Sequence, residues 1–189
     1  TASGNSCLGA GRNSTSSGLG SVALGFFASA TEDYAISVGT FSSCASTNGI
    51  SLGKQANTGS GNNNIAIGRE ALCSGSNSIA IGTGAVSIAN SIELGNSSHS
   101  LLQCQVGLSV VSDERKKKYI TDLGLGTDFL EQLRPVSFML RDDQEEYTHF
   151  GLIAQEVDEV LGRDLRYSLL HPPTEEEDSF SVTYAELIP

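Results

Sequence analysis

The stretch Asn64-Ile65-Ala66-Ile67-Gly68 decides the fold, because the chain repeats it in near-copies. Ser78-Ile79-Ala80-Ile81-Gly82 follows fourteen residues later, and five further segments end in the same apolar-glycine pair. The glycines that close these copies stand at positions 9, 25, 39, 53, 68, 82 and 95, with spacings of 13 to 16 residues. So regular a series predicts a repeat architecture, in which stacked copies share a core.

Each copy is typical of one short strand followed by a turn. In Ile65-Ala66-Ile67 the two β-branched residues share one face of the strand, and the alanine points the other way. The closing glycine allows a turn that a Cβ would block. One coil offers only one or two apolar residues per turn, so we expect several chains, and three in our preferred arrangement, to share the core.

Composition changes sharply along the chain. Residues 1–100 contain seven charged side chains and 16 of the 21 glycines, whereas the remaining 89 residues carry 26 charges. Segments after the break alternate between strand and helix patterns. The sequence therefore predicts an all-β repeat domain, a β-roll or β-helix, over residues 1–111 and a small α+β domain over residues 112–189.

The second half carries several predicted elements. A short helix is expected over 126–133, with Thr127 or Asp128 as its N-cap and Pro135 ending it. A longer helix is expected over 154–161, and another begins at 185. Strands are expected at 101–107, 136–140, 148–153 and 180–184.

Charge and residue spacing exclude several functions. The net charge of −11 argues against nucleic-acid binding, because phosphates need a basic surface. No apolar run approaches the ~20 residues of a membrane span, and the N-terminus has no signal-peptide pattern. The cysteines stand far apart, which favours free thiols over disulfides and argues against zinc: they are Cys7, Cys44, Cys73 and Cys104. We expect no metal and no cofactor.

Four motifs of the second half resemble the endosialidase-type intramolecular chaperone found at the C-termini of phage tail spikes and fibres. They are Ser112-Asp113-x-Arg115-x-Lys117, Leu133-Arg134-Pro135-Val136-Ser137-Phe138, His149-Phe150-Gly151-Leu152-Ile153-Ala154-Gln155-Glu156-Val157 and Val182-Thr183-Tyr184-x-Glu186-Leu187-Ile188-Pro189. The family usually continues into a long trimerising helix, so we expect this domain to be truncated before that helix.

The repeats resemble the head repeats of trimeric autotransporter adhesins, which also occur in phage tail fibres. The resemblance covers about residues 5–95 and implies a homotrimeric β-roll. Phe26, Phe27 and Tyr34 fit either an exposed patch that stacks on a sugar or core positions at an irregular repeat, and we favour core. The expected partners are two further copies of the chain and a host-surface receptor or glycan, with no membrane.

The chaperone resemblance implies a domain that trimerises, aligns the fibre and is then released by autoproteolysis. The family's nucleophile and base fall on Ser112 and Lys117, and cleavage falls between Val111 and Ser112. The chain would then be a single-turnover serine peptidase acting on itself, in a virion tail fibre assembled in the host cytoplasm.

The residues around Ser112 suit this chemistry. A serine hydroxyl needs a neighbouring base, and a lysine serves when burial or like charges lower its pKa. Arg115 is a candidate to polarise the Val111 carbonyl, as is a backbone N–H. Asp113 and His149 are further supporting residues, and His149 would orient or share the proton.

Other interpretations remain open. Ser112 or Asp113 can cap a helix whose Lys/Arg run is a solvated face. The domain can also be a trimerisation cap of a structural fibre that is never cleaved. A third candidate is a bacterial surface adhesin whose head repeats bind host matrix.

Overall fold

The computed structural model describes residues 1–99, 101–107, 109–122, 124–141, 147–162, 168–172 and 179–187. The chain divides into two compact units, Thr1–Ser100 and Leu101–Pro189. The functional boundary predicted between Val111 and Ser112 lies inside the second unit and stays a prediction.

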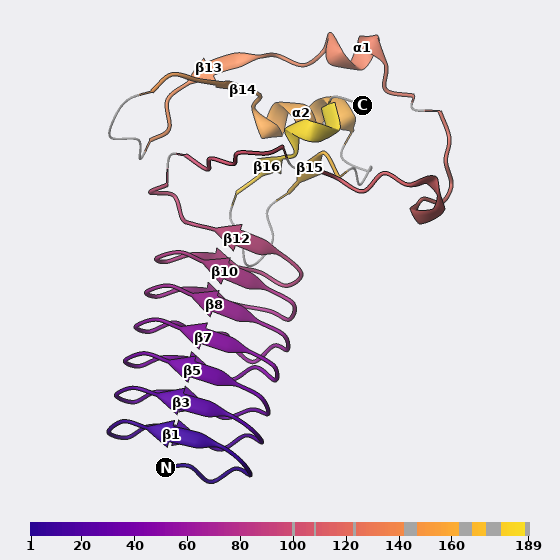
Figure 1. Cartoon of the computed structure of the whole chain (residues 1–189). Coiled ribbons are helices and arrows are strands. Elements are labelled where there is room, and N and C mark those ends of the chain that lie inside the picture. Colours follow the sequence, from indigo (N-terminus) through magenta and orange to yellow (C-terminus); the bar gives the residue numbers. More distant parts are fainter. Residues whose placement is uncertain are drawn as a thin grey trace. The chain divides into compact units, whose positions relative to one another are not determined.

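The first unit is a β-solenoid in which every coil adds one short strand to a long parallel sheet (Figure 1). Its strands are β1 (Leu8–Ala10), β3 (Val22–Leu24), β5 (Ile36–Val38), β7 (Ile50–Leu52), β8 (Ile65–Ile67), β10 (Ile79–Ile81) and β12 (Ile92–Leu94). Equivalent residues of successive copies pair, as Ile65 does with Ile79. This confirms a strand in each predicted copy. In the first copy, however, Gly9 lies inside β1, where it pairs with Ala23, and Gly11, with φ of 131°, takes the closing position.

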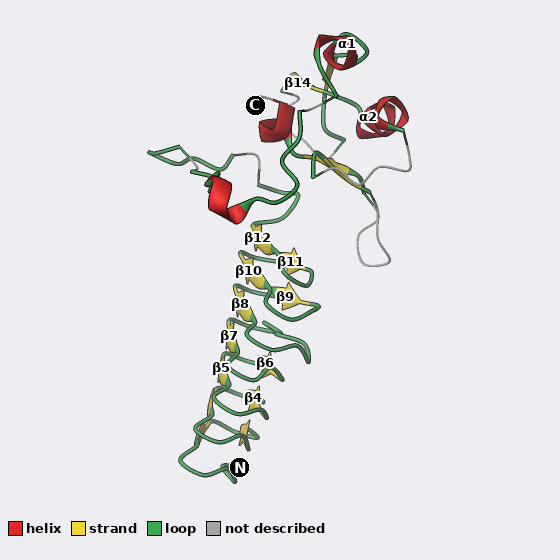
Figure 2. Cartoon of the chain, turned by 90° about the vertical axis from the view of Figure 1, so that its right-hand side faces the viewer, coloured by secondary structure: helices red, strands yellow, loops and turns green. Residues whose placement is uncertain are grey.

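A second row of shorter strands runs beside the first (Figure 2). It contains β2 (Thr15–Ser16), β4 (Ser29–Ala30), β6 (Ser43–Cys44), β9 (Leu72–Cys73) and β11 (Val86–Ser87). Asn57 bridges the gap in this row, because it pairs with both Ser43 and Leu72. A coil therefore contributes one short segment to each of the two rows, and turns join the two segments.

Small side chains fill the interior of the coils. Ala66 and Ala80 are fully buried, whereas Ile65 and Ile67 on either side of Ala66 keep part of their surface exposed. The rest of the interior is alanine, serine and cysteine, with one threonine and one asparagine. The alternation along each strand is as expected, but the small-residue face fills the coil and the branched aliphatic face lies outside.

Hydrogen bonds satisfy the polar part of this interior. The hydroxyls of Ser16 and Ser21 lie 2.7 Å apart, as do those of Ser37 and Ser42. Asn64 donates its amide to the carbonyl of Thr58 at 2.8 Å. Buried polar groups cost little when they are paired in this way, so a half-polar core is compatible with a stable coil.

Glycines let successive turns stack at van der Waals distance. Gly39 and Gly53 both have φ of +139°, a conformation that L-residues rarely adopt. A Cβ built on Gly53 would overlap the carbonyl oxygen of Gly68 in the next coil. The repeat therefore needs glycine here both for the backbone angle and for the spacing of the coils.

Two expectations for the first part of the chain are wrong. Phe26, Phe27 and Tyr34 are not core: they lie on turns with exposed fractions of 36%, 43% and 56%, because the narrow coil has no room for an aromatic ring. Residues 101–107 form no strand, and their aliphatic side chains are exposed.

The second unit is a small α+β fold, as predicted. Its elements are η1 (Glu114–Lys116), α1 (Thr127–Leu130), β13 (Val136–Phe138), β14 (His149–Gly151), α2 (Ala154–Leu161), β15 (Leu170–His171), β16 (Ser181–Val182) and η2 (Tyr184–Leu187). The strands pair as two antiparallel hairpins, β13 with β14 and β15 with β16. Gly126, not Thr127 or Asp128, is the N-cap of α1.

Apolar side chains of helices α1 and α2 form the core of this unit. Phe129 from α1 packs with Val157 and Leu161 from α2 and with Leu169. The buried positions of α2 stand four residues apart, which places them on one face of the helix. This small core holds α2 against the residues that flank the hairpins.

Replacing Gly53 with alanine should destabilise the solenoid by about 1–3 kcal/mol, because the new Cβ meets both a positive φ and a neighbouring carbonyl. The matched control is Gly107→Ala, where an added Cβ meets nothing within 4 Å. The midpoint of chemical denaturation measures the difference. Equal midpoints for the two variants would show that coil stacking does not require glycine at position 53.

Candidate functional site

The structure brings the two predicted catalytic residues together. The Nζ atom of Lys117 lies 2.7 Å from the Oγ atom of Ser112 and donates a hydrogen bond to it. This is the separation at which a base takes a proton from a nucleophile. Both side chains are exposed to solvent.

The short helix η1 produces this contact by reversing the chain between Ser112 and Lys117. Asp113 is its N-cap, and its carboxylate accepts a hydrogen bond from the backbone N–H of Arg115 at 2.9 Å. The backbone N–H of Lys117 then donates to the carbonyl of Glu114 at 2.9 Å. An acidic cap suits the positive end of such a turn.

Arg115 and Asp113 also form a side-chain pair. The guanidinium donates from Nε at 3.1 Å and from Nη2 at 2.6 Å to the two carboxylate oxygens. The guanidinium, followed by the backbone N–H of Arg115, lowers the pKa of the Asp113 carboxyl. The same pair raises the pKa of Arg115. The guanidinium of Arg115 is thus paired with the carboxylate of Asp113, on the same turn that carries Lys117.

The peptide bond before Ser112 is accessible. Val110 and Val111 have exposed fractions of 79% and 78%, which are unusual for valine. The segment from Val110 to Ser112 forms neither helix nor strand. No secondary structure therefore has to be broken for a nucleophile to reach the Val111 carbonyl.

His149 lies in the β13–β14 hairpin. Its ring stacks on the ring of Phe138 in the opposite strand, with centroids 5.6 Å apart. Within one segment, Lys117 thus contacts Ser112 and Arg115 contacts Asp113. The described ring contact of His149 is with Phe138, in the hairpin.

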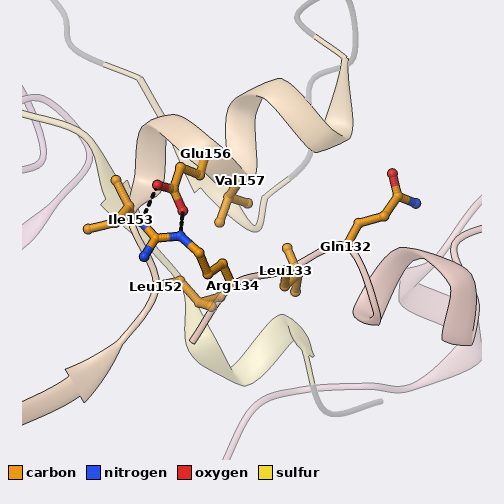
Figure 3. Close-up of a pocket in the computed structure, with 7 residues that line it drawn as sticks. All are labelled: Gln132, Leu133, Arg134, Leu152, Ile153, Glu156 and Val157. Carbon is orange, nitrogen blue, oxygen red and sulfur yellow. Dashed lines mark hydrogen bonds and ion pairs between the residues drawn. The ribbon is translucent and has the colours of Figure 1, made fainter. Parts of the chain in front are cut away.

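An ion pair that we did not predict connects two of the quoted motifs (Figure 3). The guanidinium of Arg134 donates to both carboxylate oxygens of Glu156, from Nε at 3.1 Å to one of them and from Nη2 to the other. The pair lines a small pocket with Gln132, Leu133, Leu152, Ile153 and Val157. It anchors the segment after α1 to helix α2, so its role is structural.

Tyr184 makes a second unpredicted connection between motifs. Its hydroxyl accepts a hydrogen bond from the backbone N–H of Leu152 at 3.0 Å. The hydroxyl also fills the space where a Cβ on Gly151 would lie. Glycine at 151 and tyrosine at 184 are signals in the sequence that together would have indicated this contact.

The described residues include no group of three or more His, Cys, Asp or Glu side chains arranged to hold a metal ion. No helix in the described part of the chain has the length and apolar character needed to cross a membrane.

Comparisons with known proteins match both halves of the chain. The model of the peptidase family described as the chaperone of endosialidase matches residues 112–165. The model of the YadA head domain repeat matches twice, over residues 16–42 and 60–85. No curated protein matches the chain.

One similar solved structure is the collagen-binding domain of the Yersinia adhesin YadA. It is 27% identical, and the match covers 57% of this chain and 67% of that one, with a TM-score of 0.37. The chain thus joins repeats similar to an adhesin head with a segment similar to the chaperone of endosialidase, the combination that the motifs predicted.

Proposed function

We propose that this chain is the C-terminal part of a trimeric tail fibre or spike of a virion. Its last domain directs trimerisation and folding, and is then released by cleavage between Val111 and Ser112. The observation that carries the proposal is the 2.7 Å contact between Lys117 Nζ and Ser112 Oγ. The family match, which begins at Ser112, supports the same boundary.

The cleavage chemistry balances with these two side chains and one water. Lys117, as a neutral amine, takes the hydroxyl proton while Ser112 Oγ attacks the carbonyl carbon of Val111. The peptide C–N bond breaks, the nitrogen takes up a proton, and Val111 becomes esterified to Ser112. Water then hydrolyses the ester, leaving a carboxylate on Val111 and a free amine on Ser112.

The single chain holds this pair in a resting state. Lys117 donates to Ser112, whereas a general base must accept a proton from it. Both groups are exposed to solvent. We therefore propose that trimer assembly excludes water from the pair and so switches cleavage on.

The solenoid offers a reason for assembly. The outer face of its long sheet carries two columns of aliphatic residues that the coil interior does not take up. These are Leu8, Val22, Ile36, Ile50, Ile65, Ile79 and Ile92 in one column, and Leu24, Val38, Leu52, Ile67, Ile81 and Leu94 in the other. So continuous an apolar face is typical of an interface between chains, and we propose that it faces two further copies.

Asp113 and Arg115 are positioning residues in this proposal. Their pairing stabilises the η1 turn, which in turn carries Lys117 back to Ser112. Neither side chain needs to touch the Val111 carbonyl for this role. A backbone N–H then remains the candidate to polarise that carbonyl.

The head-repeat match favours a second candidate, a bacterial surface adhesin or a structural fibre with a permanent trimerisation cap. The two functions differ in the fate of the last domain. A released domain identifies a folding aid, whereas a domain that stays attached identifies a cap.

Ser112→Ala and Lys117→Ala should each leave the chain intact, because each removes one partner of the proton transfer. The wild-type chain should run as two fragments on a denaturing gel after folding. Lys116→Ala and Lys118→Ala are matched controls, since each removes one charge from the same run but no contact to Ser112. An intact wild-type chain, or cleavage in the Lys117 variant, would rule out the dyad.

The positioning role predicts a specific dependence on pH. The pKa of Asp113 is lower in the folded chain than in the unfolded one, because Arg115 stabilises its charge. Its contribution to the turn is therefore complete above the unfolded pKa and disappears as the pH falls through the folded one. The rate of cleavage should therefore fall over this acidic pH range, because the η1 turn loses the pairing of Asp113 with Arg115.

Arg115→Ala should raise the Asp113 pKa, measured by carbon NMR titration of the carboxyl in an uncleaved Ser112→Ala chain. Arg134→Ala, which removes a guanidinium paired with Glu156 instead, should leave it unchanged. Identical Asp113 titrations with and without Arg115 would contradict the positioning role.

A further inference from the structure

One edge of the solenoid gathers aromatic and cationic side chains. It is formed by the turns after the closing glycines. The second residue of each turn donates its backbone N–H to the backbone carbonyl of the first residue in the equivalent turn of the preceding coil. Phe27 donates to Arg12 at 3.0 Å, Phe41 to Phe26 at 2.9 Å, and Glu70 to Lys54 at 2.9 Å. We call the set Arg12, Phe26, Phe27, Phe41, Lys54 and Arg69 the aromatic-cationic edge.

The three phenylalanines of this edge form one exposed cluster. Phe26 meets Phe27 edge-on at 4.6 Å between ring centroids, and Phe27 stacks on Phe41 at 5.4 Å. The guanidinium of Arg12 lies over the Phe26 ring, 5.7 Å from its centroid. Exposed aromatic clusters of this kind mark interaction surfaces rather than ordinary solvent-facing turns.

Two of the rings, Phe27 and Phe41, stand at positions where the backbone is strained. Phe27 and Phe41 have φ of 55° and 57°. Residues other than glycine and asparagine adopt such backbone angles only at a cost in free energy. The equivalent position of the coil before is Asn13, with φ of 58°. Later coils place Gln55 and Glu70 at this position with φ of 59° and 61°, so the turn accepts polar side chains and does not itself call for a ring.

Charge identifies the kind of partner. The three Lys and Arg residues of the first hundred residues, Arg12, Lys54 and Arg69, all occupy the first position of these turns. Arg12 and Lys54 lie on either side of the phenylalanine cluster. Glu70, on the same turn as Arg69, forms an ion pair with it at 3.5 Å. The cationic character of this edge therefore rests on Arg12 and Lys54, in a chain whose net charge is −11.

We infer that the aromatic-cationic edge binds an acidic glycan chain, a carboxylated sugar polymer laid along the solenoid. The C–H face of a sugar ring packs on a phenylalanine ring, and its carboxylate pairs with Arg12 or Lys54. From Arg12 to Lys54 the edge spans three coil steps, about 14 Å at the spacing of neighbouring strands. This rests on the proposed fibre function and names its ligand class.

A second copy of the chain fits this edge less well. The anions of the opposite turns, Glu32 and Asp33, lie at one level of the solenoid, whereas the cations extend over several coils. Asp33 is also engaged, because it accepts a hydrogen bond from the backbone N–H of Leu19 at 2.8 Å. Only a partner extended along the solenoid meets the whole edge.

The test is binding of tetragalacturonic acid to the full-length Ser112→Ala chain, compared with the fully methyl-esterified tetramer, by calorimetry. The wild-type edge should prefer the acid by about tenfold or more. Phe27→Asn with Phe41→Asn should weaken acid binding at least about tenfold. Arg12→Thr with Lys54→Thr, which copies the Thr40 turn, should reduce binding of the acid to that of the ester.

The matched control is Tyr34→Asn, which makes the same exchange at a positive φ on the opposite turns, where Asn48 stands in the next coil. It should leave binding unchanged. Equal binding of acid and ester, or an equal loss in the Tyr34 variant, would overturn the inference. Loss of the trimer in the phenylalanine variant, seen as a lower mass by light scattering, would assign the edge to contact between copies. Absence of acid binding to the Ser112→Ala chain, together with cleavage of the chain that keeps Ser112, would reject the ligand alone and leave the proposed function standing.

Discussion

The width of the coil is the constraint on which the rest of the solenoid depends. The two rows of strands face each other so closely that Ala66, Ala80 and their equivalents fill the space between them. Branched side chains are excluded from that space and lie on the outer face of the long sheet. A single chain therefore buries little apolar area, and burial of apolar area is the main stabilising contribution in a folded protein. We propose that two further copies of the chain make up this deficit.

A narrow, repetitive core also leaves register weakly specified. Successive coils pair Ile with Ile and Ala with Ala or Ser, so a slip by one coil would pair residues of the same kind. A separate domain that assembles first would fix the register of the repeats. The second unit suits this role, because it has its own core around Phe129 and Val157. Its release after assembly would then leave the fibre without it.

Local patterns predicted much of this structure, and tertiary packing decided the rest. Glycine spacing located the strands of the long sheet, except that the first copy closes at Gly11 and not at Gly9. The spacing is informative because turn geometry at Gly39 or Gly53 is a property of the backbone. The inward face was not predictable, since it depends on the distance between two sheets. For the same reason Phe26 and Phe27 were expected in a core too narrow to hold them. The Ser112–Lys117 contact followed from the motif, but the pairing of Arg115 with Asp113 depended on the η1 turn.

Separation of trimers from monomers, followed by intact-mass spectrometry of each fraction, tests the account most directly. The account predicts that the trimer contains two fragments, one ending at Val111 and one beginning at Ser112, and that the monomer is intact. Cleaved monomers would contradict the dependence of cleavage on assembly. Trimers that remain intact after folding is complete, or a cut at another bond, would contradict the assignment of the scissile bond.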